Sequence, residues 1–188
     1  MPTNRLIVKE QIAAYASVLF EAVNSSGGAE GVIEVLDQSR QVVAVMRESA
    51  NLEETLKDSA LAPEQRATIA RNVFAGCDPA LVDVLAVMAE RGEAGYLARV
   101  ADGVEQMMAD KLNLVVVDVT TAVELDDHLR GIIKEKAERE LGKNVVLNER
   151  VDKAVLGGII MSTSSERIDA SLLTQVENAR NALKTQVK

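Results

Sequence analysis

Apolar residues recur every three or four positions through the first 110 residues, which is the spacing of one face of an α-helix. The clearest run consists of Ile12, Tyr15, Ala16, Leu19, Phe20 and Val23. The polar and glycine residues Asn24–Gly28 predict the end of this first helix. Five further helical patterns occupy residues 32–46, 52–57, 63–76, 78–92 and 97–108. Short connections between amphipathic helices are typical of antiparallel bundles, so residues 1–110 are predicted to form an antiparallel six-helix bundle.

The pattern changes near Lys111. Residues 112–123 are rich in β-branched side chains and predict a strand, and residues 125–143 predict a helix. Residues 144–151 and 155–163 predict two more strands. The last helix carries Leu172, Val176, Ala179 and Leu183 at helical spacing, and Asp169 or Ser171 is expected to cap it. The fold class is therefore α+β, with a small C-terminal α/β module in residues 111–188.

Composition supports two modules with different surroundings. The chain has 188 residues but only two Phe, two Tyr and no Trp, so its cores must be aliphatic. Residues 1–110 carry 17 acidic and 9 basic side chains, whereas residues 111–188 carry 12 of each. The net charge of −8 speaks against duplex nucleic acid as a partner, because such proteins need a basic face. The uneven charge suggests that the two modules have different partners.

The cysteine count and the lack of long apolar segments indicate the cellular compartment. Cys77 is alone, which excludes a disulfide framework and favours a reducing compartment. No run of about 20 apolar residues is long enough to span a bilayer. The first residues carry charges throughout and lack the apolar core of a signal peptide, so they are expected to form the first helix of the mature fold.

No constellation of catalytic or metal-ligating residues emerges from the sequence. His128 is the only histidine and has the spacing of an exposed helix position. Cys77 follows a glycine at a helix end, where a packing role is the simpler interpretation. Asp126 and Asp127 are adjacent, so they favour a helix start rather than a shared metal ion. We expect no catalytic residue, no metal and no cofactor, although an enzyme with an irregular site is a competing hypothesis.

The glycine pair Gly157–Gly158 raises the question of a phosphate site. It matches neither the G-x-x-x-x-G-K-[ST] nor the G-x-G-x-x-G pattern. The residues after it are apolar and predict a strand, whereas a phosphate site needs a helix N-terminus there. Crowding of the backbone or a bulge in the strand is the better account of the pair.

Three motifs near the C-terminus carry a family resemblance: Val151-Asp152, Leu156-Gly157-Gly158-Ile159-Ile160 and Ile168-Asp169-Ala170-Ser171. Together with "IAAYASVLFEAV" near the N-terminus and "VLAVMAERG" in the fifth predicted helix, they span nearly the whole chain. The chain resembles the delta subunit of F-type ATP synthases, called the oligomycin-sensitivity conferral protein in mitochondria. In this resemblance Asp152, Gly157, Gly158, Asp169 and Ser171 are structural signature residues.

The sequence departs from the family pattern in two places. Ala170 stands where the family usually has glycine, which indicates that a positive φ is not essential there. Residues 162–166 replace a more common short Gly-Asp turn, which leaves the geometry of the hairpin open.

The resemblance implies a non-catalytic stator. The N-terminal bundle would hold the N-terminal peptide of an alpha subunit of the catalytic head. The C-terminal module would engage the end of stalk subunit b. The protein would then resist rotor torque during proton-coupled ATP synthesis without a small-molecule substrate of its own. It would lie peripherally on the cytoplasmic side of a bacterial membrane, or in the equivalent place in an organelle.

Two apolar residues lie off the predicted core faces: Val18 in the first helix and Val87 in the fifth. With Tyr15 at the border of the first face, they match the family positions that receive the alpha peptide. The competing interpretation is that they are scattered surface residues, which are common. For the stalk contact, the pattern of apolar residues in the last helix does not show which of them are buried in the core and which bind the partner. A helical adaptor unrelated to ATP synthase is the alternative function.

Overall fold

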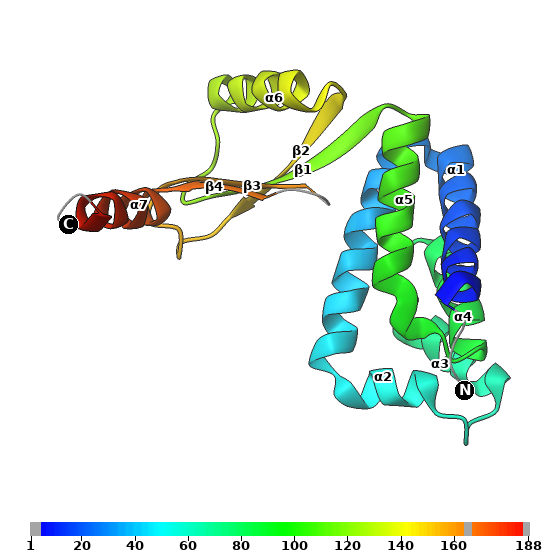
Figure 1. Cartoon of the computed structure of the whole chain (residues 1–188). Helices are drawn as coiled ribbons and strands as arrows, with labels where there is room; N and C mark the ends of the chain where they lie inside the picture. Colours follow the sequence, from blue (N-terminus) through cyan, green and yellow to red (C-terminus); the bar gives the residue numbers. More distant parts are fainter. Residues whose placement is uncertain (1–4, 164–166, 186–188) are drawn as a thin grey trace. The chain divides into compact units, whose positions relative to one another are not determined.

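The computed structural model describes residues 5–163 and 167–185, and the fold is α+β (Figure 1). The chain divides into two compact units, Met1–Leu112 and Asn113–Lys188. The sequence pattern places its boundary between residues 110 and 111. The described part contains seven α-helices and one four-stranded sheet, and all strands belong to the second unit.

The N-terminal unit is helical. Its elements are α1 (Arg5–Glu48), α2 (Ala50–Lys57), α3 (Pro63–Val73), α4 (Pro79–Glu90), the short 3₁₀ turn η1 (Ala94–Tyr96) and α5 (Leu97–Lys111). Proline opens α3 and α4, where a missing N–H costs no helical hydrogen bond. Asp78 caps α4, because its side chain accepts a hydrogen bond from the Ala80 N–H at 2.8 Å.

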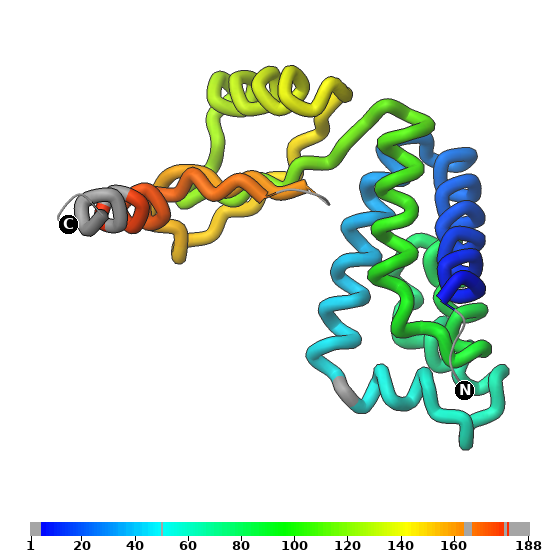
Figure 2. The backbone as a smooth tube through the Cα atoms, viewed as in Figure 1, coloured from blue at the N-terminus to red at the C-terminus, as the bar shows by residue number. Residues whose placement is uncertain are grey.

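A bundle of six separate helices is not confirmed, because the first two predicted helices form the single element α1. The predicted stop at residues 24–28 is nevertheless confirmed at its last residue, because Gly28 leaves helical geometry with φ 59° and ψ −150° and divides α1 into two helical arms. A Cβ on Gly31 would lie 3.3 Å from Cγ1 of Val23, whereas eight residues of straight helix span about 12 Å. The chain therefore folds back at Gly28, between the dark-blue and light-blue arms of α1 in Figure 2.

The predicted core face of α1 is buried, with Ile12, Ala16, Leu19, Phe20 and Val23 at most 7% exposed. Helix α1 packs closely on α5: a Cβ on Gly103 would lie 2.9 Å from the Cβ of Ala16. The rest of the core is aliphatic, as the composition requires. The largest fully buried side chains include Leu56, Leu81, Leu85, Met88, Leu97 and Met108.

The C-terminal unit contains β1 (Leu114–Thr121), α6 (Asp127–Leu141), β2 (Asn144–Val151), β3 (Gly158–Ser162), β4 (Arg167–Ser171) and α7 (Leu172–Thr185). The sheet order is β2-β1-β3-β4, with β1 and β2 parallel and the other pairs antiparallel. Helix α6 connects the parallel pair and lies over one face of the sheet (Figure 1). Its Ala137 packs with Val117, Val119 and Val145 in the core.

Strand β4 corrects the sequence interpretation, which treats residues 168–171 as the start of the last helix. Five residues are too few for a period to be read, and pairing with β3 supplies the hydrogen bonds that make them a strand. Ala170 lies in this strand and has no positive φ, in agreement with its departure from the family pattern. Residues 164–166 of the preceding hairpin lie outside the described residues.

Backbone crowding at the glycine pair is confirmed. Gly158 has φ 84°, and a Cβ there would lie 2.5 Å from the carbonyl oxygen of Ala170 and 2.9 Å from the Cα of Ser171. The carbonyl of Gly157 accepts a hydrogen bond from the Leu172 N–H at 2.9 Å. The pair thus brings β3 against the junction of β4 and α7.

Ser171 caps α7, because its Oγ accepts a hydrogen bond from the Thr174 N–H at 3.4 Å. Asp169 accepts a hydrogen bond from the Ser171 N–H at 3.0 Å. Hydrogen bonding by Ser171 holds the pKa of Asp169 below its usual value. Of the other signature residues, Asp152 donates its backbone N–H to the carbonyl of Thr121 at 2.8 Å, which extends the end of β1.

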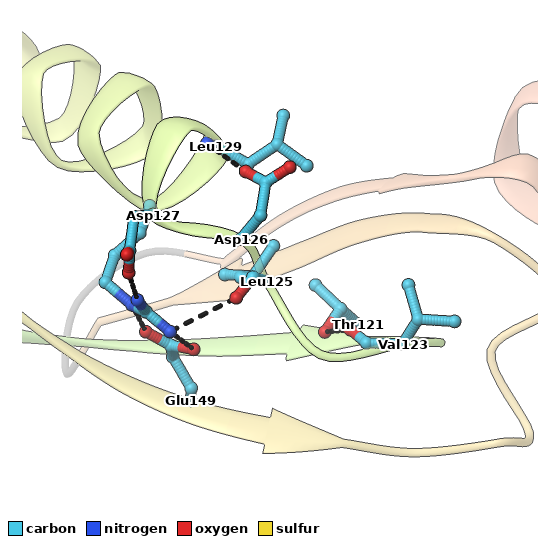
Figure 3. A network of polar contacts seen from close by, with 8 residues as sticks. Thr121, Val123, Leu125, Asp126, Asp127, Leu129 and Glu149 are labelled. Atoms are coloured by element: carbon cyan, nitrogen blue, oxygen red, sulfur yellow. Dashed lines mark hydrogen bonds and ion pairs between the residues drawn. The ribbon is translucent and has the colours of Figure 1, made fainter.

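The start of α6 is fixed by a polar network (Figure 3). Asp126 caps the helix by accepting a hydrogen bond from the Leu129 N–H at 2.7 Å, which confirms the predicted helix start. Arg130 binds Asp127 and both oxygens of Glu149 on β2, and it donates to the carbonyl of Leu125 at 3.2 Å. The hydrogen bonds from Arg130 lower the pKa of Glu149.

We predict that Gly158→Ala destabilises the C-terminal unit by at least about 2 kcal/mol, because a Cβ would clash with backbone at a positive φ. The matched control is Gly131→Ala in α6, where a Cβ meets nothing within 4 Å. Alanine there should stabilise the helix by up to about 1 kcal/mol. Urea denaturation followed by circular dichroism measures both changes. Equal stabilities of the two variants would contradict the predicted clash at Gly158.

Candidate partner-binding surfaces

Val18 and Val87 lie on the surfaces of two helices that contact each other, α1 and α4. Their side chains are 60% and 37% exposed. Ala14 and Ala22, one helical turn to either side of Val18, are also exposed. Helix α1 therefore presents a narrow apolar stripe that faces away from its own core, and α4 adds one exposed valine.

Tyr15 ties α1 to the loop after α4. Its hydroxyl donates a hydrogen bond to Oε2 of Glu93 at 2.7 Å and accepts one from Nη1 of Arg91 at 3.3 Å. The Arg91 guanidinium carbon lies 5.9 Å from the centre of the Tyr15 ring. Burial raises the pKa of Tyr15, and the carboxylate of Glu93 adds to this effect. The half-buried ring therefore braces the surface on which Val18 lies, because its hydroxyl is engaged within the unit.

Arg66 of α3 holds the end of α4, and sequence reasoning missed it. Its guanidinium donates to the carbonyls of Ala89 at 2.9 Å and Glu90 at 2.6 Å, which are end groups of α4. It also donates to the carbonyls of Asp58 at 2.6 Å and Leu61 at 3.4 Å, before α3.

Helix α4 has no basic residue in its own last turn, so Arg66 supplies from another helix the positive charge that a helix C-terminus favours. In the sequence Arg66 is one of two arginines in a predicted helix, and the pattern does not reveal that its partners are backbone carbonyls.

The C-terminal unit exposes a second apolar surface. Leu172, Leu173 and Val176 of α7 are 50%, 56% and 63% exposed, and Leu156 before β3 is 77% exposed. These positions of the last helix are therefore not core. The side chain of Leu183, which the sequence pattern adds to them, lies outside the described residues.

His128 and Cys77, the two residues considered for chemistry, belong to different units. His128 is exposed on α6. Cys77 is half-buried before α4, and burial raises the pKa of its thiol, which lowers the thiolate fraction. Within the described ranges, no group of three His, Cys, Asp or Glu side chains is placed to hold a metal ion. Over the same part of the chain, no helix is long and apolar enough to cross a membrane.

We predict that Arg66→Lys lowers the free energy of unfolding by about 2–3 kcal/mol, because lysine cannot reach carbonyls on both sides of the site. Arg71→Lys on the same helix is the control, since the side chain of Arg71 is 51% exposed. It should change stability by less than about 0.5 kcal/mol. Thermal and urea unfolding measure both. Similar losses in the two variants would show that the hydrogen bonds of Arg66 do not stabilise the unit.

We predict that Tyr15 ionises above the usual tyrosine value near 10 and that Glu93→Gln lowers its pKa. Because the folded pKa is raised, the stabilisation is complete below the unfolded pKa and is lost as the pH rises through the folded pKa. Absorbance at the phenolate band measures the titration in a Tyr96→Phe background, where Tyr15 is the remaining tyrosine. An unchanged pKa in Glu93→Gln would contradict the role of this contact.

Comparisons with known proteins agree with one another. Residues 12–183 match the family described as ATP synthase delta (OSCP) subunit. The chain is 30% identical over 180 residues to an ATP synthase subunit delta from Azorhizobium caulinodans, covering 95% of each chain. It is 28% identical over 164 residues to an ATP synthase subunit delta from Prochlorococcus marinus strain AS9601, covering 86% of this chain and 89% of the relative.

A solved structure shares the fold. A chain of the Toxoplasma gondii mitochondrial ATP synthase hexamer superposes with a TM-score of 0.54 at 18% identity, covering 92% of this chain and 96% of that chain. The match to the family spans most of both units, and the curated relatives are matched over most of their length. The chain therefore belongs to the ATP synthase delta (OSCP) subunit family, and it is a non-catalytic stator component of the peripheral stalk of ATP synthase.

Proposed function

We propose that this protein joins the catalytic head of ATP synthase to the rest of the peripheral stalk through two separate contacts. In this proposal residues 1–110 bind the N-terminal peptide of an alpha subunit, and residues 111–188 bind the end of stalk subunit b. The observation that supports it is that each compact unit exposes its own apolar helical surface. One surface for each partner is the minimum that a connecting subunit requires.

The alpha-peptide surface is assigned to the exposed stripe of α1 and to Val87 of α4. An amphipathic partner helix recognises such a surface by laying its apolar side along it. Fully burying a valine contributes about 1.5–3 kcal/mol, so covering the exposed parts of Val18 and Val87 would contribute a corresponding fraction of that to the affinity. The contact of Tyr15 with Glu93 keeps α1 in place beside α4, which preorganises the surface.

The stalk surface is assigned to α7. Leu172, Leu173 and Val176 expose apolar area along the first two turns of this helix. An amphipathic helix of subunit b would cover them in the same way. The cap by Ser171 and the crowded glycine pair fix the direction in which α7 leaves the sheet.

The proposed task is mechanical. A stator component prevents the head from turning with the rotor during proton-coupled ATP synthesis, so it needs firm attachments rather than reactive groups. It would reach the membrane only through the complex, peripherally, on the cytoplasmic side of a bacterial membrane or in the equivalent place in an organelle.

The test is calorimetric titration of the full chain with a synthetic peptide of the cognate alpha-subunit N-terminus, and separately with a C-terminal segment of subunit b. Val18→Asp or Val87→Asp should weaken alpha-peptide binding by about tenfold or more, because each removes apolar contact area and adds a charge that must be desolvated. Leu173→Asp should weaken binding of the b segment instead.

Each variant is the control for the other unit, and Val45→Asp is the matched control within the N-terminal unit. Val45 is also an exposed valine of α1, at 43%, and its replacement should leave both titrations unchanged. No binding of the alpha peptide by the folded wild-type chain would refute the alpha-subunit contact. An adaptor role with different partners would then account better for the same apolar surface.

A further inference from the structure

The N-terminal unit contains a second candidate binding surface, which is positively charged rather than apolar. A cavity of about 570 Å³ lies between the start of α1 and the start of α5. Its lining consists of Arg5, Val8, Lys9, Tyr96 and Arg99. Every charged side chain in this lining is a cation. We refer to these five residues as the basic cavity.

The cations of the basic cavity have no ion-pair partner in the part of the chain that the structure describes. Arg5, Lys9 and Arg99 are exposed, and none of them forms an ion pair with any of the residues that the structure describes. Arg99 contacts the ring of Tyr96, with its guanidinium carbon 5.9 Å from the ring centre. These three side chains are a third of the 9 basic residues in a segment that carries 17 acidic ones. Three cations therefore gather at one place in a unit whose net charge is negative.

The backbone increases the positive potential there. The described part of α1 begins at Arg5, and α5 begins at Leu97 directly after the 3₁₀ turn η1, so the N-terminal ends of two helices lie beside the cavity. Neither helix has an acidic residue in its first turn, where a carboxylate would be stabilising. Arg5 and Arg99 instead place cations at these ends, which is the unfavourable sign for an isolated protein. An anionic partner would reverse this unfavourable arrangement.

The shape of the basic cavity favours a protein segment over a small phosphate-bearing ligand. Pockets for small molecules enclose most of their ligand and are largely apolar. Here the cations are long, exposed side chains on two helices, and the buried Val8 and the half-buried Tyr96 form the apolar part. Arginine forks bind carboxylates with two parallel hydrogen bonds. If that protein segment carries an apolar side chain between its carboxylates, this side chain would contact Val8 and Tyr96.

We propose that the basic cavity binds an acidic segment of another ATP synthase subunit, with closely spaced carboxylates on Arg5, Lys9 and Arg99. This contact is separate from the proposed alpha-peptide surface. Lys9 and Val18 are nine positions apart on α1, which at about 100° per residue places them on opposite sides of the helix. The inference rests on membership in the complex and does not require the alpha-peptide contact.

The experiment is carbodiimide cross-linking of the assembled ATP synthase, followed by mass spectrometry. This reagent joins an amine to a carboxylate that touches it, so Lys9 reports on acidic groups inside the basic cavity. We expect an amide between Nζ of Lys9 and an Asp or Glu of another subunit. It should be absent with Lys9→Arg, which keeps the charge but cannot form the product. If Lys9 links only to carboxylates of its own chain, or to none while other lysines of this chain do cross-link, the proposal is wrong.

A second measurement separates binding from folding. Arg99→Glu should weaken rebinding of the full chain to synthase depleted of this subunit by about tenfold, because the reversed charge repels the acidic segment. The same change should leave the melting temperature equal or higher, since an acidic residue suits a helix N-terminus. Arg71→Glu, an equal charge change outside the cavity, is the control.

Titration of each variant with the alpha peptide distinguishes the two proposals. Arg99→Glu should leave that titration unchanged, and a loss there would show that the cavity and the alpha-peptide surface are not separate. Rebinding weakened equally by Arg71→Glu would show a general charge effect and overturn the assignment. Rebinding prevented by millimolar tripolyphosphate but insensitive to Arg99→Glu would likewise overturn it.

Discussion

The N-terminal unit depends on one buried guanidinium. A charged side chain is stable inside a protein only when its hydrogen bonds are satisfied, and Arg66 satisfies its own with backbone carbonyls from the α2–α3 connection and from the end of α4. It thereby fixes where α4 ends and where the following loop begins. That loop carries Glu93, whose carboxylate receives the hydroxyl of Tyr15 from α1. The contact between Tyr15 and Glu93 therefore links α1 to a loop that Arg66 positions, and the buried apolar face of α1 packs the same helix on α5.

In the C-terminal unit, the start of a helix is fixed by close backbone packing rather than by a buried charge. Its critical point is the junction of β4 and α7, where the absence of a Cβ on Gly158 lets two backbone segments meet. Ser171 then caps α7, and the first turns of that helix expose leucine and valine. In both units, polar or steric constraints fix the end of a helix, and the apolar side chains near it stay available. A connecting subunit needs different residues for folding and for binding, because a side chain that is buried in the fold cannot also contact a partner.

The features that follow from periodicity could be predicted from the sequence. The buried face of α1 and the change to strands near residue 111 depend on patterns of ten residues or more. Crowding at Gly158 was also predictable, because glycine at the start of a strand indicates that another backbone segment approaches closely. Strand β4 was missed because five residues show no period, and its pairing with β3 is non-local. Arg66 was missed because its carbonyl partners lie up to 24 residues away, and no side-chain pattern marks a carbonyl.

The distribution of charge also bears on the stator role. A body held to a rotating machine at one point can pivot about that point, whereas attachments on opposite sides of one rigid element prevent pivoting. Helix α1 has an apolar stripe around Val18 on one side and the basic cavity around Lys9 on the other. An apolar contact gives affinity with little directional preference, and paired charges give register. In the proposed contact, three cations in a unit with a net negative charge would also favour one orientation of docking.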